Sequence, residues 1–177
     1  MSLNLNLLLL AEVDREAAST RRVLERIPDE HFGWKPHEKS MTLGRLATHV
    51  AELPLWINRI LDTDDFDFGA QPYQPVIADN REGLLSFFED KLQAGRMALG
   101  LATDEQLAQT WVFRRGEYVI GKDVRYQMLR QWMLNHQVHH RGQLTVYLRL
   151  LDIPVPGLYG PSADERPAPR PVEASKG

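Results

Sequence analysis

Apolar residues recur at three- and four-residue spacing in four long stretches of the chain, and charged residues fill the positions between them. This pattern is typical of amphipathic α-helices, because residues three and four apart share one face of a helix. The predicted helices cover about residues 5–27, 42–61, 79–101 and 122–151. Pro28 and Pro154 end the first and the last of them. Pro54 lies inside the second, where we expect it to bend or loosen the helix.

A different pattern separates the third and fourth predicted helices. Residues 111–120 carry β-branched and aromatic side chains on both sides of the sequence Arg114-Arg115-Gly116, which is typical of a small β-hairpin. Residues 161–177 are rich in Pro, Ala, Ser and charge, and we expect this C-terminal tail to be partly disordered. The chain is therefore predicted to form one all-α domain over residues 1–160, a four-helix bundle with a short β-hairpin before the last helix.

Composition narrows the chemistry that this domain can perform. The 177 residues contain no cysteine, which excludes a thiol nucleophile, a redox Cys pair, a thiolate zinc site and an iron–sulfur cluster. Any transition metal must be held by nitrogen and oxygen ligands. The formal net charge is −3 and no basic stripe is present, so we expect no nucleic-acid partner.

One apolar run near the N-terminus raises the question of a membrane span or a signal peptide. The run Leu7–Leu10 is followed at once by the charged residues Glu12, Asp14 and Arg15, and no Lys or Arg precedes it. It is too short for a membrane span and lacks the basic flank of a signal peptide. We therefore expect a cytoplasmic protein that does not enter a membrane.

The candidate chemistry lies in the histidines. His136 and His140 are four residues apart, so both imidazoles leave the same face of the last predicted helix, the face that points to the core. This spacing lets two nitrogen ligands converge on one ion. His49 lies in line with Leu46 and Leu53 on the core-facing stripe of the second predicted helix. Together the three histidines form a candidate three-nitrogen metal site with an open coordination position.

A structural role competes with this interpretation, because histidines on apolar faces are often core residues without a metal. Two neutral imidazoles buried together then need partners for their nitrogens, and each unmet group costs about 1–3 kcal/mol. His139 points about 60° away from His136. Packing, a hydrogen bond to a metal ligand or a subunit contact all suit it better than direct ligation. His31 and His37 lie in a predicted loop and are expected at the surface.

Three further segments of the chain form an ordered combination: residues 135–144 (NHQVHHRGQL), residues 34–41 (WKPHEKSM) with 46–49 (LATH), and residues 159–165 (YGPSADE). This combination resembles the DinB-like (YfiT-like) metalloprotein family. The resemblance spans about residues 5–165. It implies a four-helix bundle with an up-down-down-up course, often a homodimer. It also implies one divalent ion, zinc or nickel or sometimes another first-row metal, held by His49, His136 and His140.

The resemblance, with the histidine pattern, favours a metal-dependent enzyme of the thiol S-transferase or hydrolase type acting on a small-molecule substrate. Such an ion activates water or a low-molecular-weight thiol, which the cysteine-free chain cannot itself supply. Candidates for contacts with the ligands or the substrate are Glu52, Asn135, Gln143 and Tyr147, with Trp56 beside them. The alternative is a non-catalytic metal- or ligand-binding bundle or an interaction module. Arg141, about 140° from His136, is expected to face solvent or a partner subunit.

Overall fold

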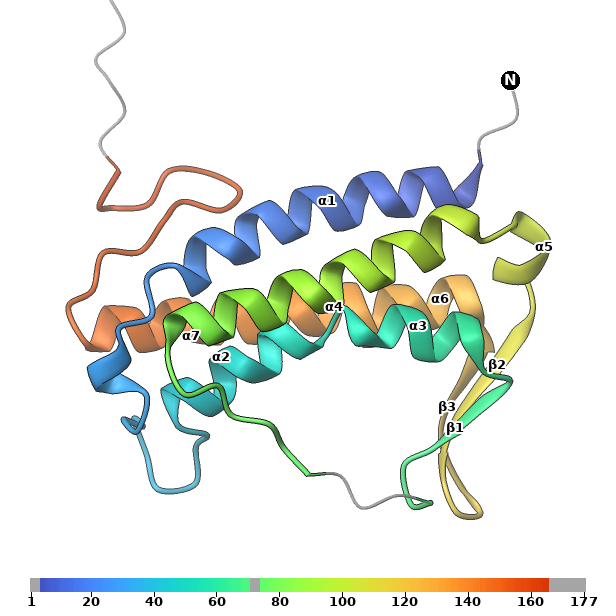
Figure 1. The fold of residues 1–177 in the computed structure, drawn as a ribbon, viewed down its shortest axis with the longest axis horizontal. Coiled ribbons are helices and arrows are strands. Elements are labelled where there is room, and N and C mark those ends of the chain that lie inside the picture. Colours follow the sequence, from blue (N-terminus) through green and yellow to red (C-terminus); the bar gives the residue numbers. More distant parts are fainter. Residues whose placement is uncertain (1–3, 71–73, 166–177) are drawn as a thin grey trace, which may run out of the picture.

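The computed structural model describes residues 4–70 and 74–165, which form a mostly helical fold with a small sheet at one end (Figure 1). The α-helices are α1 (Leu5–Leu24), α2 (Leu43–Glu52), α3 (Leu55–Asp62), α4 (Arg81–Leu101), α5 (Asp104–Leu107), α6 (Arg125–Leu129) and α7 (His136–Leu150). A 3₁₀ turn, η1 (Asp29–His31), follows α1, and a π-helical segment, η2 (Arg130–Asn135), joins α6 to α7. The strands are β1 (Asp65–Asp67), β2 (Thr110–Arg115) and β3 (Tyr118–Val124).

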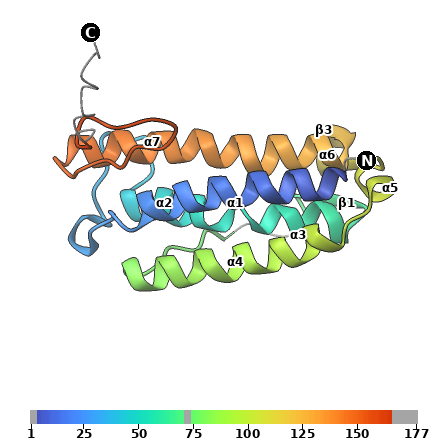
Figure 2. The same ribbon diagram turned by 90° about the horizontal axis from the view of Figure 1, so that it is seen from above.

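The helices lie along a common direction and enclose one apolar core. In Figure 2, α1 runs between α4 and α7, and α2 and α3 lie on its far side in the same direction. Contacts join α1 to α4 and α7, and α2 to the same two helices. The core side chains at these contacts are fully buried and include Val23, Leu46, Val50, Phe88 and Leu144. Burial of these side chains, each contributing about 1.5–3 kcal/mol, holds α2 and α7 at a fixed separation.

The second predicted helix is divided at Pro54, as its position indicated. α2 ends at Glu52 and α3 begins at Leu55, because proline has no N–H to continue the helical hydrogen bonds. The amides of Trp56 and Ile57 bond three residues back instead, to the carbonyls of Leu53 and Pro54, each at 3.0 Å. After the break the two helices have different neighbours: α2 packs against α4 and α7, and α3 packs against α4 and α6.

The last predicted helix also changes character along its length. Between α6 and α7 the chain adopts the wider π-helical turn of η2, and His136 is the first residue beyond it. Single π-helical turns inside longer helices are rare and occur often at functional sites. Here the π-turn ends immediately before the two histidines of α7.

The expectation of an all-α fold with an isolated hairpin is wrong in one respect. β2 and β3 pair antiparallel as predicted, but β1 joins them in parallel to give a three-stranded sheet of order β1-β2-β3. β1 lies between the second and third predicted helices, in an acidic stretch where the sequence indicated no strand, since Asp is depleted in strands. The guanidinium group of Arg114 holds it in place, with Nε 2.6 Å from Asp65 and Nη1 2.5 Å from Asp67.

After α7 the chain returns along the helices rather than leaving them. Nη2 of Arg22 on α1 lies 2.5 Å from the Glu165 carboxylate, and Nη2 of Arg149 on α7 lies 2.5 Å from Asp164. The first residues of the expected tail are therefore attached to the fold, and residues 166–177 lie outside the described residues. Among the helices that the structure describes, none has the length and apolar character needed to cross a membrane.

Candidate metal centre

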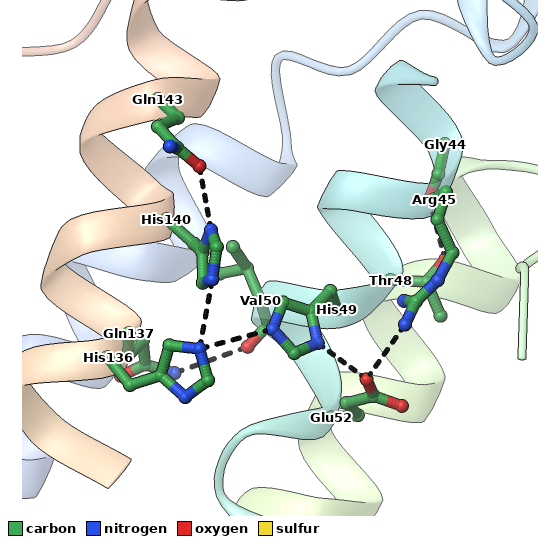
Figure 3. A network of polar contacts seen from close by, with 10 residues as sticks. All are labelled: Gly44, Arg45, Thr48, His49, Val50, Glu52, His136, Gln137, His140 and Gln143. Atoms are coloured by element: carbon green, nitrogen blue, oxygen red, sulfur yellow. Dashed lines mark hydrogen bonds and ion pairs between the residues drawn. The ribbon is translucent and has the colours of Figure 1, made fainter. Parts of the chain in front are cut away.

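Three half-buried histidines from two neighbouring helices converge between α2 and α7. His49 extends from α2 toward α7, and His136 and His140 extend back from one face of α7, one turn apart (Figure 3). Their candidate ligand nitrogens all lie within 4.8 Å of one another. Nε2 of His136 is 2.9 Å from Nε2 of His140 and 3.4 Å from Nε2 of His49. The predicted triad is thus brought together at one point.

These separations match those of nitrogen ligands around a small cation. Zinc–imidazole bonds are about 2.0–2.1 Å long, and a tetrahedral angle between two of them separates the nitrogens by about 3.3 Å. The two Nε2···Nε2 distances, 2.9 and 3.4 Å, lie close to this value on either side.

The outer nitrogens of two rings are already occupied. Nδ1 of His49 lies 2.6 Å from Oε1 of Glu52, and Nδ1 of His140 lies 2.7 Å from Oε1 of Gln143. Both partners are acceptors, so both Nδ1 atoms carry the proton and both Nε2 atoms present a lone pair to the centre. The Gln143 amide is oriented consistently, because its Nε2 lies 3.2 Å from the ring of His139. Carboxylate and amide oxygens commonly fix metal-binding imidazoles in this way.

The centre therefore lacks protons for its lone pairs. Nε2 of His136 faces the Nε2 lone pairs of His49 and His140. A proton on it can form a hydrogen bond with one of them and leaves the other without a partner. Burial, and after it the nearby His140 and His49, lowers the pKa of His136 to about 4, and burial also lowers the pKa of His140. At neutral pH these two rings are uncharged bases. A divalent cation is the group that satisfies three converging lone pairs, so the residues present fit a metal.

The structure separates the other predicted residues by role. Glu52 and Gln143 contact the triad directly, as described above. Asn135 is exposed at the end of η2, immediately before α7. Tyr147 lies further along α7, where its hydroxyl donates to the carbonyl of Met41 at 3.3 Å and its ring meets Trp34 edge-on at 5.6 Å. Tyr147 therefore holds the loop before α2 and does not contact the histidines.

The expectation for Arg141 is wrong. Its side chain is 1% exposed and pairs with Glu16 on α1, with 2.5 Å between Nη2 and Oε2. It also donates to the hydroxyls of Thr20 and Tyr159 at 3.0 and 2.5 Å. The expectation failed because α7 is covered by α1 as well as by α2, so a second face of α7 is also buried.

Several residues beside the triad were not predicted as site residues. A cavity of about 230 Å³ adjoins His49 and His136, and Arg45, Arg59 and Trp132 form part of its wall. Two signals were available, because Arg45 precedes His49 by four residues and Trp132 precedes His136 by four residues, so each shares a helix face with its histidine. Arg59 comes from α3, and only the folded chain brings it to this place.

The fold and the site together define a helical protein with a half-buried three-histidine centre suited to a divalent metal. Residues 1–170 match the model of the DinB family, and the chain belongs to this family. The uncharacterized protein YrdA of Bacillus subtilis is 29% identical over 151 residues, which are 85% of each chain.

Solved structures of similar proteins agree with the fold. A DinB-like protein from Bacillus cereus is 26% identical and superposes with a TM-score of 0.62 over 82% of this chain and 92% of its own. The DinB-like protein YjoA of Bacillus subtilis, 22% identical, gives a TM-score of 0.63 over 82% and 94%. At that identity the second likeness concerns the fold alone.

Proposed function

We propose that this protein is a divalent-metal-dependent enzyme of the thiol S-transferase or hydrolase type. In this proposal His49, His136 and His140 hold one zinc or nickel ion or another first-row metal. One observation carries it: the Nε2 atoms of the triad converge while Glu52 and Gln143 occupy the outer nitrogens of two rings. When bound, the ion supplies a Lewis acid that lowers the pKa of water or of a low-molecular-weight thiol.

The residues of the chain have distinct tasks in this proposal. The three neutral imidazoles leave the charge of a divalent ion undiminished, and a three-nitrogen ligand set leaves a position for a small-molecule substrate. The Glu52 carboxylate fixes the ring of His49 and lies on the cavity wall, where it can also accept a proton from an incoming thiol or water. Because the chain has no cysteine, any thiol in the reaction arrives as a cosubstrate.

The fold supports a finer description. We propose that α1, α2 with α3, α4, and α6 to α7 correspond to the four helices of an up-down-down-up bundle. Within it, α2 and α3 count as one helix broken at Pro54, and α6 to α7 as one helix interrupted by the π-helical turn.

A homodimer is part of the same proposal. Large apolar side chains stay exposed on α1 and α4, among them Leu7 at 55%, Met97 at 62% and Leu101 at 84%. Exposed apolar groups of this kind favour association with a second copy. Light scattering after size exclusion is expected to give about twice the chain mass, and a particle of 20.3 kDa would refute the dimer.

Metal content tests the proposed centre. Protein purified without an affinity tag is expected to carry about one divalent ion per chain by elemental analysis. The double variant His136→Ala, His140→Ala is expected to lose it, whereas His139→Ala, the matched control one position from His140, keeps it. Metal content that is unchanged in the double variant would overturn the metal site.

Activity is tested separately from metal binding. The metal-loaded protein is screened at neutral pH with low-molecular-weight thiols and electrophiles, and with hydrolysable esters and amides. We expect turnover that chelation abolishes and that His49→Ala lacks. Activity that survives both treatments would remove the metal from the mechanism. A protein that holds its ion but turns over none of these compounds would favour a non-catalytic metal-binding role.

A further inference from the structure

The cavity beside the triad has a wall of aromatic rings. It measures about 230 Å³, and His49 and His136 form one side of it. Trp56, Phe113 and Trp132 form another, together with Phe68. An apolar cavity of about 150 Å³ accepts benzene, so this volume has room for one ring or for two fused rings. Any molecule held here lies directly against two of the three histidines.

The aromatic wall is rigid because its rings pack on one another. Trp56 and Trp132 are stacked, with centroids 5.9 Å apart and planes inclined by 27°. Phe113 meets both edge-on, at 5.1 Å from Trp56 and 4.8 Å from Trp132. Pairs in these geometries are stabilised beyond the effect of their buried area. The wall therefore presents fixed flat surfaces and edges, which suit a planar ring better than a flexible aliphatic chain.

The same cavity carries excess positive charge. Arg45 and Arg59 are among the residues that line it, and Glu52 is the acidic residue among them. Nη2 of Arg45 lies 3.4 Å from Oε1 of Glu52, so these two charges offset each other, and the formal net charge of the lining residues is +1. The Glu52 carboxylate is engaged with His49 at 2.6 Å.

Arg59 is the guanidinium group tied to the aromatic wall. Its central carbon lies 5.2 Å from the ring centroid of Trp56 and 4.7 Å from that of Phe66. Stacking of this kind orients the guanidinium plane, and a planar guanidinium matches a carboxylate with two parallel hydrogen bonds. An oriented positive group at the edge of an aromatic cavity is the chemistry that recognises a ring bearing an acid.

We propose that this cavity binds a small aromatic carboxylate, with its ring against Trp56, Phe113 and Trp132 and its carboxylate at Arg59, supported by Arg45. This assignment of a substrate class rests on the proposed function, because the metal centre is where the bound molecule would react. The binding step itself involves only residues of the cavity wall and can be measured without a metal.

The test is a ligand comparison on the full-length, metal-free protein, prepared with a chelator. Isothermal titration calorimetry compares 2-naphthoate with 2-naphthamide, which keeps the ring and removes the charge. A hydrogen bond to a charged group contributes about 1.5–3 kcal/mol, so naphthoate is expected to bind at least about tenfold more tightly. Acetate, which has the charge without the ring, is expected not to displace naphthoate.

Variants test whether Arg59 is the positive group that causes the preference for naphthoate over naphthamide. Arg59→Gln is expected to bring naphthoate affinity down to that of naphthamide and to leave naphthamide unchanged. Arg26→Gln is the matched control, because it removes the same charge from an exposed residue of the chain after α1 that does not line the cavity. Equal affinity for the two compounds in the wild-type protein, displacement by acetate, or no effect of Arg59→Gln would each overturn the proposal.

A bound metal would itself attract a carboxylate. A further variant therefore separates the effect of the metal on naphthoate binding from the effect of Arg59. His140→Ala removes one proposed ligand without altering the cavity wall, because His140 does not line it. Preference for naphthoate in this variant supports the role of Arg59, and a preference that appears only with added zinc overturns it. Metal content is measured in parallel. Naphthoate binding by a chain that never retains metal would refute the proposed metal centre alone, and metal retention without naphthoate binding would refute the cavity assignment alone.

Discussion

Oε1 of Glu52 lies 2.6 Å from Nδ1 of His49, one turn earlier on the same helix, and it also receives Nη2 of Arg45 at 3.4 Å (Figure 3). The contact keeps the proton of His49 on Nδ1 and turns Nε2 toward the centre. The carboxylate thus determines which nitrogen is available to a metal, without lying at the centre itself.

Replacing this carboxylate is expected to weaken metal binding. Glu52→Ala removes the group that orients His49, and loss of such a partner lowers metal affinity by about 10–100-fold. Glu52→Gln keeps an acceptor oxygen and is expected to retain most of the affinity. Competition with a chromogenic zinc chelator measures both variants against the wild type. Affinity unchanged in Glu52→Ala would show that the helix backbone alone orients His49.

Gln143 is expected to act on His140 in the same way, with a smaller effect. Its Oε1 accepts from Nδ1 of His140 at 2.7 Å, but Gln143 is exposed and water can replace it. We expect Gln143→Ala to lower zinc affinity less than Glu52→Ala does, and Gln143→Glu to preserve it. The same chelator competition gives both values. His139→Ala is the control, because it removes the far partner of the Gln143 amide and leaves the acceptor in place. A larger loss in His139→Ala than in Gln143→Ala would contradict this ordering.

Acid is expected to destabilise the metal-free protein through His136. Burial and the neighbouring histidines lower the pKa of this residue from 6.5 to about 4. Between these two values the unfolded chain binds a proton that the folded chain does not, so the free energy of unfolding rises with pH across this window. Above pH 6.5 this contribution is complete. Urea denaturation in the presence of a chelator measures the slope, which His136→Gln is expected to reduce. An equal slope in that variant would assign the effect to other groups.

The buried pair between α1 and α7 gives a stability prediction. Arg141 is 1% exposed and lies 2.5 Å from Glu16, so Glu16→Ala leaves a buried charge without its carboxylate. Such a change costs about 3–5 kcal/mol. Arg22 and Glu165 have the same separation of 2.5 Å in an exposed place, and Glu165→Ala is expected to cost about 1 kcal/mol or less. Urea denaturation compares the two, and equal costs would mean that burial of Arg141 carries no penalty.

Much of this organisation could be predicted from local sequence. The long helices follow from spacing of three and four residues, and the triad follows because His136 and His140 are one turn apart on a core-facing stripe. β1 could not be predicted, because Asp65-Phe66-Asp67 becomes a strand only when Arg114 and β2 lie beside it.

Arg141 and the cavity were missed for related reasons. A helical periodicity gives the angle between two side chains but not the number of elements that cover the helix. The second buried face of α7, which packs against α1, was therefore not predicted. The cavity wall combines Arg59 from α3, Phe113 from β2 and Trp132 from η2. No spacing within one segment could relate these three residues.

The packing of α4 against the break between α2 and α3 gives the last prediction. A Cβ on Gly95 would lie 2.9 Å from Cδ1 of Ile57 and 3.0 Å from the carbonyl oxygen of Pro54, so Gly95→Ala forces the two helices apart. Overpacking of this kind costs about 1–3 kcal/mol, more than the gain in helix propensity of about 1 kcal/mol. Gly100, on the same helix, has nothing within 4 Å of a Cβ, and Gly100→Ala is expected to stabilise the protein slightly. Thermal denaturation should therefore move in opposite directions for the two variants. A gain for both would show that α4 can shift away from Pro54 without cost.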